Sequence, residues 1–335
     1  MEPLVFIVGC ARSGTTLLQR MVNAHPQIAI SPETHWLTQY FPERKWHKKK
    51  ACVTPEQITS IVQHERFYQL ELSREEFEGL LGAGERVRPG PFLERLFALY
   101  GRKKGKPLVG NKTPAYVQRI RKLHKVWPAA RFLHLIRDGR DVCLSVLSWE
   151  YACRTAALYA TWAEDPVSTT ALWWAQKVRL GREAGQALPA GLYHELRYEE
   201  LVARPAEECA RLCDFLGVAY DDAMLRFQEG PPPPDQASHP WRPIQAGMRD
   251  WRAQLPAADV ERFEAAAGDL LDELGYPRAF PCPGPDRIKH AALLRELFAQ
   301  DASLQNRVLP EGAGVSARWV TGAGPRPPEC REGAD

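Results

Sequence analysis

Two short stretches of the chain carry side chains of the types that move protons and bind anions. In SPETHWL, Glu33 and His35 are two residues apart, so an extended backbone would place both side chains on the same side. A carboxylate placed in this way is suited to take the proton of an attacking hydroxyl or amine. In NKTPAY, Pro114 disfavours the α region at Thr113, so Lys112 stands at a fixed, non-helical approach to the helix that follows.

Each of these side chains also has a purely structural interpretation. Glu33 could be a carboxylate near a helix N-terminus, and His35 a satisfied polar residue. Lys112 could be an ordinary exposed loop lysine. We expect Glu33 to be the base and His35 to orient it, but whether Glu33 or His35 takes the proton stays open.

The stretch GCARSGTT connects a predicted buried strand, LVFIV, to a predicted helix. A glycine loop at such a junction directs successive backbone N–H groups toward one point, and the helix N-terminus adds positive potential. Gly9 and Gly14 permit the tight turn, and four side chains add hydrogen-bond donors: Arg12, Ser13, Thr15 and Thr16. The polar density favours an anion-binding loop over a glycine turn that merely joins two elements.

The glycine spacing of this loop matches the GxxxxGK[ST] loop of kinases and nucleotide triphosphatases. Thr15 occupies the position where that loop requires a lysine to bridge the β- and γ-phosphates. A P-loop kinase or NTPase, which would need ATP and Mg²⁺, therefore stays the alternative and not the main interpretation.

A second candidate anion site lies in RFLHLIRDGRDVCLSVL. Arg137 stands at the end of a predicted strand, and Ser145 follows eight residues later on the next predicted helix. The carboxyl edge of a parallel sheet opens onto the ligand crevice, where a guanidinium can fork onto a phosphate. Taken alone, the stretch could equally be an ordinary strand-to-helix connection capped by Asp138 or Asp141.

Together, FIVGCARSGTTLL and RFLHLIRDGRDVCLSVL resemble the 5′-phosphosulfate loop and the 3′-phosphate element of sulfotransferases that use 3′-phosphoadenosine-5′-phosphosulfate (PAPS). The resemblance implies that PAPS is the co-substrate. It implies a 5′-end site made by the loop, with Arg12, Ser13, Gly14, Thr15 and Thr16. It also implies that Arg137 and Ser145 bind the 3′-phosphate.

Three further stretches are similar to elements of the same family. Glu33-Thr34-His35-Trp36 is similar to a segment of glycan sulfotransferases whose glutamate is the catalytic base, and NKTP is similar to an element whose lysine contacts the oxygen bridging sulfur and phosphorus. LRYEEL resembles a segment that would place Tyr198 at the adenine. GMRDWRAQL is similar to a late loop over the 3′-phosphate, with these candidates: Gly247, Arg249, Trp251 and Arg252.

The resemblance is strongest to the glycan and tyrosyl-protein types. It implies transfer of a sulfuryl group to a hydroxyl or amine of a carbohydrate, peptide or metabolite. A nucleotide-binding protein without catalytic activity is the alternative from a different class. The sequence leaves the acceptor and the oligomeric state open.

Strand and helix patterns alternate along the chain, which predicts an α/β fold with a P-loop-type parallel sheet flanked by helices. Buried strands are expected at 4–8, 107–110, 131–136 and 192–198, and helices at 15–25, 116–126, 139–150, 205–218 and 256–274. We expect a single domain over 1–280 and a Pro/Gly-rich C-terminal extension over 281–335 with one short helix at 286–299. The role of that extension and of the PPPP loop at 231–234 is open.

Composition excludes several classes of function. With 335 residues, 44% hydrophobic residues and a formal charge of +3, the chain can bury a core and is not expected to bind nucleic acid. No stretch approaches the roughly 20 apolar residues of a membrane span. The 8 cysteines form no CxxC pair, and the histidines show no metal-ligand spacing, so we expect a reducing, cytoplasmic location and no metal.

Overall fold

The computed structural model describes residues 2–33, 35, 40–41, 52–64, 66–82, 84–149, 152, 155–229 and 249–308, the last without the side chains of 302–308. Several features singled out in the sequence lie outside these residues: Thr34, Trp36, the PPPP loop, Gly247 and the tail beyond 308.

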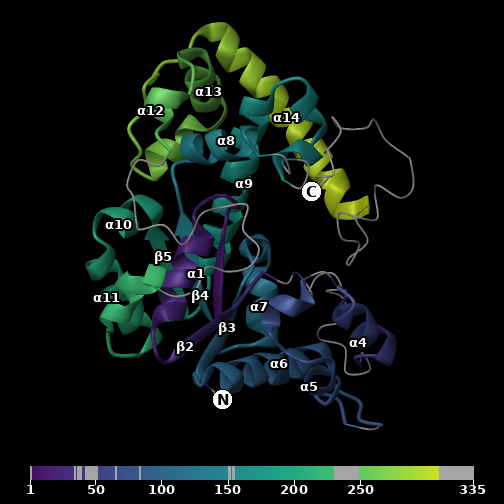
Figure 1. The fold of residues 1–335 in the computed structure, drawn as a ribbon. Helices are drawn as coiled ribbons and strands as arrows, with labels where there is room; N and C mark the ends of the chain where they lie inside the picture. Colours follow the sequence, from purple (N-terminus) through teal and green to yellow (C-terminus); the bar gives the residue numbers. More distant parts are fainter. Residues whose placement is uncertain are drawn as a thin grey trace, which may run out of the picture. The chain divides into compact units, whose positions relative to one another are not determined.

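The strands of the described residues form one five-stranded parallel sheet with the order β2-β3-β1-β4-β5 (Figure 1). Their bounds are β1 Val5–Gly9, β2 Ile28–Ser31, β3 Leu108–Lys112, β4 Arg131–Ile136 and β5 Tyr193–Arg197. The sheet confirms the predicted α/β class. β1 lies at the centre of the sheet, because the chain crosses to β2 and β3 on one side of it and to β4 and β5 on the other. In the register of the strands, Ile7 pairs with Lys112 and Gly9 pairs with Leu135.

Helices cover both faces of the sheet because β1 is apolar on both sides. Alternate residues of a strand point to opposite faces, so Phe6 and Val8 pack into one core while Val5 and Ile7 pack into the other. The first core is covered by α6 (Pro89–Lys104) and α7 (Ile120–Val126), and the second by α1 (Thr15–Ala24) and α11 (Pro205–Leu216) (Figure 1).

Shorter elements complete this part of the chain. They are α4 (Pro55–Val62), the 3-10 turn η1 (Phe67–Leu70), α5 (Arg74–Glu78), η2 (Pro114–Arg119), α10 (Tyr198–Ala203) and η6 (Asp222–Glu229). Capping boxes start α4 at Thr54 and α5 at Ser73, each closed by a side chain three residues later. These helices add apolar residues such as Ile58, Ile61 and Phe77 to the first core.

The chain divides into two compact units. The first comprises 1–9, 14–136 and 181–246 and contains the sheet; the second comprises 10–13, 137–180 and 247–335. The second unit contains η4 (Ala156–Leu158), η5 (Ala160–Ala163) and five helices: α8 (Gly139–Leu147), most of α9 (Pro166–Gln186), α12 (Trp251–Gln254), α13 (Ala257–Glu273) and α14 (Pro285–Val308). The division into a domain at 1–280 and an extension at 281–335 stays a prediction.

The helix expected at 286–299 is present and longer, since α14 runs from Pro285 to Val308. One face of α14 is buried within its unit through Ala291, Leu294 and Phe298, and the Phe298 ring stacks on Tyr159 with centroids 4.2 Å apart. None of the helices in the described part of the chain has the length and apolar character that crossing a bilayer requires.

Candidate active site

Each of the five strands has, at or shortly after its carboxyl end, a residue that the sequence analysis assigned to the site. These are Arg12 after β1, Glu33 after β2, Lys112 as the last residue of β3, Arg137 directly after β4 and Tyr198 directly after β5. Carboxyl ends of parallel strands meet at one edge of the sheet, and ligands of such sheets bind outside that edge. Within the first unit the fold therefore brings the segments of Glu33, Lys112 and Tyr198 to this edge of the sheet, while Arg12 and Arg137 belong to the second unit.

The glycine loop has the backbone conformation that its sequence predicts. Gly14 has φ of 92°, and Arg12, with φ of 71°, also lies in the left-handed region. A Cβ on Gly14 would lie 2.5 Å from the Tyr198 ring, so the loop also needs glycine for space. Ser13 is fully buried, and its Oγ has no hydrogen-bond partner among the described residues. The loop thus has a hydroxyl without a hydrogen-bond partner in the described part of the chain, beside the start of α1, where an anion is favoured.

The Tyr198 ring lies against Gly14 of this loop. The adenine contact expected for it stays a prediction.

Arg12 links the two elements that the sequence analysis identified separately as candidate anion sites. Its Nε donates a hydrogen bond to Ser145 Oγ at 2.9 Å, and its guanidinium lies 4.7 Å from the centre of the Trp149 ring. The loop after β1 and helix α8 therefore meet within the second unit. Trp149 was not predicted, because only the folded chain shows that a tryptophan two turns beyond Arg140 stacks on the loop.

A cluster of guanidinium groups surrounds this contact. Burial lowers the pKa of Arg12, and the charges of Arg249 and Arg137 lower it further. Arg137 is 7% exposed and donates to Asp141 Oδ2 at 3.4 Å; burial raises the pKa of Asp141 although Arg137 opposes the rise. Mutual repulsion of three cations close together is relieved by a bound anion, so the cluster is suited to hold a phosphate group.

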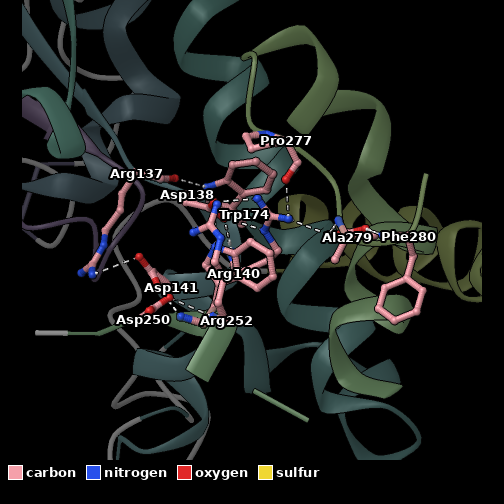
Figure 2. Close-up of polar contacts among 12 residues, drawn as sticks. Arg137, Asp138, Arg140, Asp141, Trp174, Asp250, Arg252, Pro277, Ala279 and Phe280 are labelled. Carbon is pink, nitrogen blue, oxygen red and sulfur yellow. Dashed lines mark hydrogen bonds and ion pairs between the residues drawn. The ribbon is translucent and has the colours of Figure 1, made fainter. Parts of the chain in front are cut away.

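Arg140 supports the turn that carries Arg137 (Figure 2). Its side chain is fully buried and donates to Asp138 Oδ1 at 3.0 Å, to Asp138 Oδ2 at 2.8 Å and to Glu264 Oε1 at 2.5 Å. The guanidinium lies 3.7 Å from the centre of the Trp251 ring, and its Nη1 also donates to the Pro277 carbonyl at 3.0 Å. This buried cation connects α8 to α13 and to the segment after α13.

Trp251 and Arg249 differ in what they can do for a ligand. Trp251 Nε1 donates to Asp138 Oδ2 at 3.1 Å and its backbone N–H donates to Asp141 Oδ1 at 3.0 Å, so its ring is part of the scaffold. Arg252 lies 4.4 Å from the centre of the Trp251 ring. Arg249 donates to Ser148 Oγ at 3.1 Å and is close enough to Arg12 to lower its pKa. Arg249 is thus the member of the late segment that belongs to the cationic cluster.

The candidate catalytic residues lie together in the first unit. Glu33 Oε1 is 2.6 Å from His35 Nε2, and Glu33 Oε2 is 3.1 Å from Lys112 Nζ. Lys112 Nζ also lies 3.5 Å from the hydroxyl of Thr16 on α1. Lys112 is only 6% exposed, so the alternative of an exposed loop lysine is wrong, and Thr113 has the extended backbone that Pro114 predicts, with φ of −137°.

The geometry of the Glu33–His35 pair differs from the expectation. We predicted an extended stretch with both side chains on one side, but His35 has φ of 56°, in the left-handed region. The imidazole therefore reaches the carboxylate by a local turn of the backbone, and not by strand alternation.

Three positive groups control the ionisation of Glu33. Burial opposes its charge, but Lys112, the hydrogen bond and charge of His35, and Arg66 outweigh burial and hold the pKa of Glu33 well below its usual range. Arg66 also donates to the backbone carbonyl of Glu33 at 3.1 Å. Arg66 was not predicted, because it lies 33 residues further along the chain and only tertiary contact reveals it.

Among the residues that the structure describes, there is no group of three or more His, Cys, Asp or Glu side chains that could hold a metal ion. The expected absence of a metal stays a prediction.

Comparison with known proteins identifies related chains. The model of a family described as "Sulfotransferase family" matches residues 3–222. The chain is 25% identical over 316 residues to "Protein-tyrosine sulfotransferase" of Drosophila melanogaster, with 88% of this chain and 55% of that protein covered. It is 28% identical over 305 residues to "Nodulation protein NoeE" of Sinorhizobium fredii, with 83% and 67% covered. The chain spans about half the length of the first curated relatives it matches.

A solved structure shares the fold. The sulfotransferase domain of the Synechococcus PCC 7002 olefin synthase superposes with a TM-score of 0.56 at 22% identity, over 82% of this chain and 95% of that one. This similarity confirms the P-loop-type α/β fold with a parallel sheet flanked by helices.

Proposed function

Because this chain belongs to the sulfotransferase family, we propose that it transfers a sulfuryl group from PAPS to a hydroxyl or amine of an acceptor by in-line displacement. The observation that carries the proposal is the position of Lys112 Nζ, 3.1 Å from the Glu33 carboxylate and 3.5 Å from the Thr16 hydroxyl. The Lys112 ammonium thus lies beside both the proposed base and the first turn of the helix that follows the phosphate loop.

In the proposed reaction, Glu33 takes the proton of the acceptor while the acceptor oxygen or nitrogen attacks sulfur. The bond between sulfur and the bridging oxygen breaks, and that oxygen leaves on 3′-phosphoadenosine-5′-phosphate (PAP). Lys112 stabilises the negative charge that grows on the leaving oxygen. This charge is larger in the transition state than in the ground state, so the interaction lowers the barrier. His35 orients the Glu33 carboxylate through the 2.6 Å contact.

The ground state of the free protein pairs Glu33 with Lys112, which makes the carboxylate a weak base. A sulfuryl donor whose bridging oxygen attracts the Lys112 ammonium would loosen this pair and raise the basicity of Glu33. Proton removal would then follow donor binding, so Glu33 would deprotonate the acceptor only when the donor is present.

The cofactor roles rest on the cationic cluster and the loop. Loop residues Arg12, Ser13, Gly14, Thr15 and Thr16 are proposed to bind the 5′-phosphosulfate end. Arg137 and Ser145 are proposed to bind the 3′-phosphate, and Tyr198 the adenine. The buried hydroxyl of Ser13 and the crowding of Arg12 by two other arginines support these roles.

A transfer assay separates this function from its rivals. The protein is incubated with PAPS or with ATP and Mg²⁺, with and without EDTA, over a panel of acceptors, and mass spectrometry follows the gain of SO₃ or phosphate. We expect SO₃ transfer that survives EDTA. Phosphate transfer that EDTA abolishes would favour the kinase alternative, whereas PAP binding without product across the panel would favour a non-catalytic nucleotide-binding protein.

For the acceptor we propose the phenolic hydroxyl of a peptide tyrosine. The support is the set of relatives named protein-tyrosine sulfotransferases and the positive charge of Arg66 beside Glu33, which suits a peptide with acidic residues near its tyrosine. Carbohydrate and small-metabolite hydroxyls are the competing arms of the acceptor panel. The cytoplasmic location is likewise a proposal, and the identity of the acceptor bears on it.

A further inference from the structure

A buried amide ties the strand that carries Lys112 to the segment that carries Glu33. Asn111, the residue before Lys112 on β3, is 1% exposed. Its Nδ2 donates to Ser31 Oγ at 2.9 Å and to the Pro32 carbonyl at 2.9 Å. Ser31 is the last residue of β2 and the register partner of Asn111. The two hydrogen bonds thus extend the link between the strands past the point where the β ladder ends.

The orientation of this amide is fixed by Thr113. The Thr113 hydroxyl donates to Asn111 Oδ1 at 2.7 Å, and Thr113 is fully buried. Because the carbonyl oxygen of the amide faces this donor, its NH₂ group must face Ser31 and Pro32. A buried amide with its bonds made on both ends has one orientation, since turning it over would leave buried groups unpaired.

These contacts lie one residue from each member of the catalytic pair. Pro32 precedes Glu33, and Asn111 precedes Lys112. The hydrogen bond from the Asn111 side-chain amide to the Pro32 carbonyl therefore sets the distance between the Glu33 and Lys112 backbones. On its other side, the Glu33 backbone is held by Arg66 at 3.1 Å. The 3.1 Å distance between Glu33 Oε2 and Lys112 Nζ is the result of this frame.

We propose that Asn111 and Thr113 form a positioning pair that fixes Glu33 against Lys112 for the transfer step. Neither residue needs to touch the nucleotide or the acceptor. The roles of Glu33 and Lys112 in this inference rest on the proposed function, whereas the positioning itself is a statement about the geometry of the two residues.

Two substitutions remove the hydrogen bonds of the Asn111–Thr113 pair while keeping the size of its side chains. Thr113→Val deletes the hydroxyl that orients the amide, and Asn111→Asp replaces the donor toward the Pro32 carbonyl by an acceptor. The matched control is Thr169→Val, because Thr169 is also fully buried and its hydroxyl bonds to the Thr161 hydroxyl at 2.9 Å. All three variants are measured for kcat at saturating PAPS, for PAP affinity by calorimetry and for Tm.

We expect Thr113→Val and Asn111→Asp to lower kcat about 10- to 100-fold, since displacements of this kind cost up to about 100-fold in rate. PAP affinity should change less than about 2-fold, and Thr169→Val should keep its kcat at a similar loss of Tm. If kcat in Thr113→Val falls no further than in Thr169→Val, or falls only in parallel with PAP affinity, the positioning role is overturned.

A second measurement does not depend on activity. A ¹³C NMR titration follows the carboxyl of Glu33 in the wild-type protein and in Thr113→Val. Loosening the pair should raise the pKa of Glu33, because Lys112 then stabilises the carboxylate less. If the pKa of Glu33 rises in Thr113→Val but the wild-type protein transfers no sulfuryl group, the positioning pair is supported and the proposed function is rejected. An unchanged Glu33 titration would reject the positioning pair, whatever the activity.

Discussion

Arg12 Nε donates a hydrogen bond to Ser145 Oγ at 2.9 Å, although the two residues are 133 positions apart in the chain. One belongs to the glycine loop after β1 and the other to α8, in the stretch that follows Arg137. The two elements that the sequence marked independently as anion-binding therefore meet. One nucleotide with phosphates at both ends requires two such elements near each other, and this hydrogen bond places them so.

We predict that Arg12→Met weakens PAP binding about 10- to 100-fold, the loss expected when a charged hydrogen bond to phosphate is removed. The same variant should not lower the Tm of the nucleotide-free protein, because it relieves the repulsion among Arg12, Arg137 and Arg249. Calorimetry and thermal melts measure both effects. Arg74→Met, which breaks only an exposed pair with Glu78, serves as the control. A lower Tm with unchanged PAP affinity would contradict the anion role.

Glu33 should titrate differently once Lys112 is removed. Lys112 and His35 now hold the pKa of Glu33 below its usual range against burial. Lys112→Met removes the largest of the charges that lower the Glu33 pKa, so this pKa should rise and the acid limb of the rate profile should move to higher pH. In the wild-type protein the ionised Glu33 contributes stability at pH values above the ordinary glutamate pKa, and this contribution is lost as the pH falls toward its depressed pKa.

The Lys112 prediction is checked by ¹³C titration of Glu33 and by kcat against pH, with the exposed Lys125→Met as the control. We expect Lys112→Met to reduce kcat far more than PAP affinity. An acid limb that stays in place in Lys112→Met would show that Lys112 does not govern Glu33.

His134 makes the stability of the first unit depend on pH. This histidine of β4 is fully buried, contacts the Tyr193 hydroxyl at 2.6 Å, and has its pKa lowered to about 3 by burial and, to a smaller degree, by Arg182. The unfolded chain binds the proton near pH 6.5 and the folded chain only near 3, so stability is full above about pH 6.5 and falls as the pH is lowered through this window.

Between pH 7 and pH 5, His134 should cost about 2 kcal/mol of unfolding free energy, since each pH unit below the unfolded pKa costs about 1.4 kcal/mol. Urea unfolding at both pH values measures the difference. His134→Gln should flatten it. An equal pH dependence in the wild type and His134→Gln would contradict this assignment.

Arg140 offers a test of the scaffold beneath Arg137. Arg140→Met leaves Asp138 and Glu264 as buried carboxylates without their cation, which should cost about 3–5 kcal/mol of unfolding free energy. Arg179→Met breaks an exposed pair with Asp269 in the same unit and should cost at most about 1 kcal/mol. Equilibrium unfolding of the two variants compares them. Similar losses would mean that the buried network does not hold this part of the chain.

Patterns that are local in sequence predicted most of the fold. The apolar runs at 4–8 and 131–136, the glycine loop and the helix after it appear close to where they were expected, because burial and turn chemistry act over few residues. Strand β2 was missed, since it has only four residues between Pro26 and Pro32. Helix α9 was also missed, because Leu172, Trp173, Trp174 and Ala175 are buried in succession and give no helical stripe.

The site was predictable in its residue types but not in its arrangement. Glu33, Lys112, Arg12 and Ser145 could be chosen from motifs, because each lies in a short stretch near the end of a strand or in the helix that follows one. The left-handed backbone of His35 could not be chosen in this way, since nothing in its sequence demands it. Neither could Arg66 or the Asn111 amide, whose importance comes from contacts between distant segments.

The central claim is that the glycine loop and the Arg137–Ser145 element bind the two phosphate groups of one adenosine bisphosphate. A calorimetric cycle tests it most directly, with PAP and adenosine 5′-monophosphate titrated into the wild type and into Arg137→Ala. We predict one site per chain, with a loss of about 10-fold or more for PAP in Arg137→Ala and almost none for the monophosphate. Equal losses for both nucleotides, or undiminished PAP binding in Arg137→Ala, would contradict the claim.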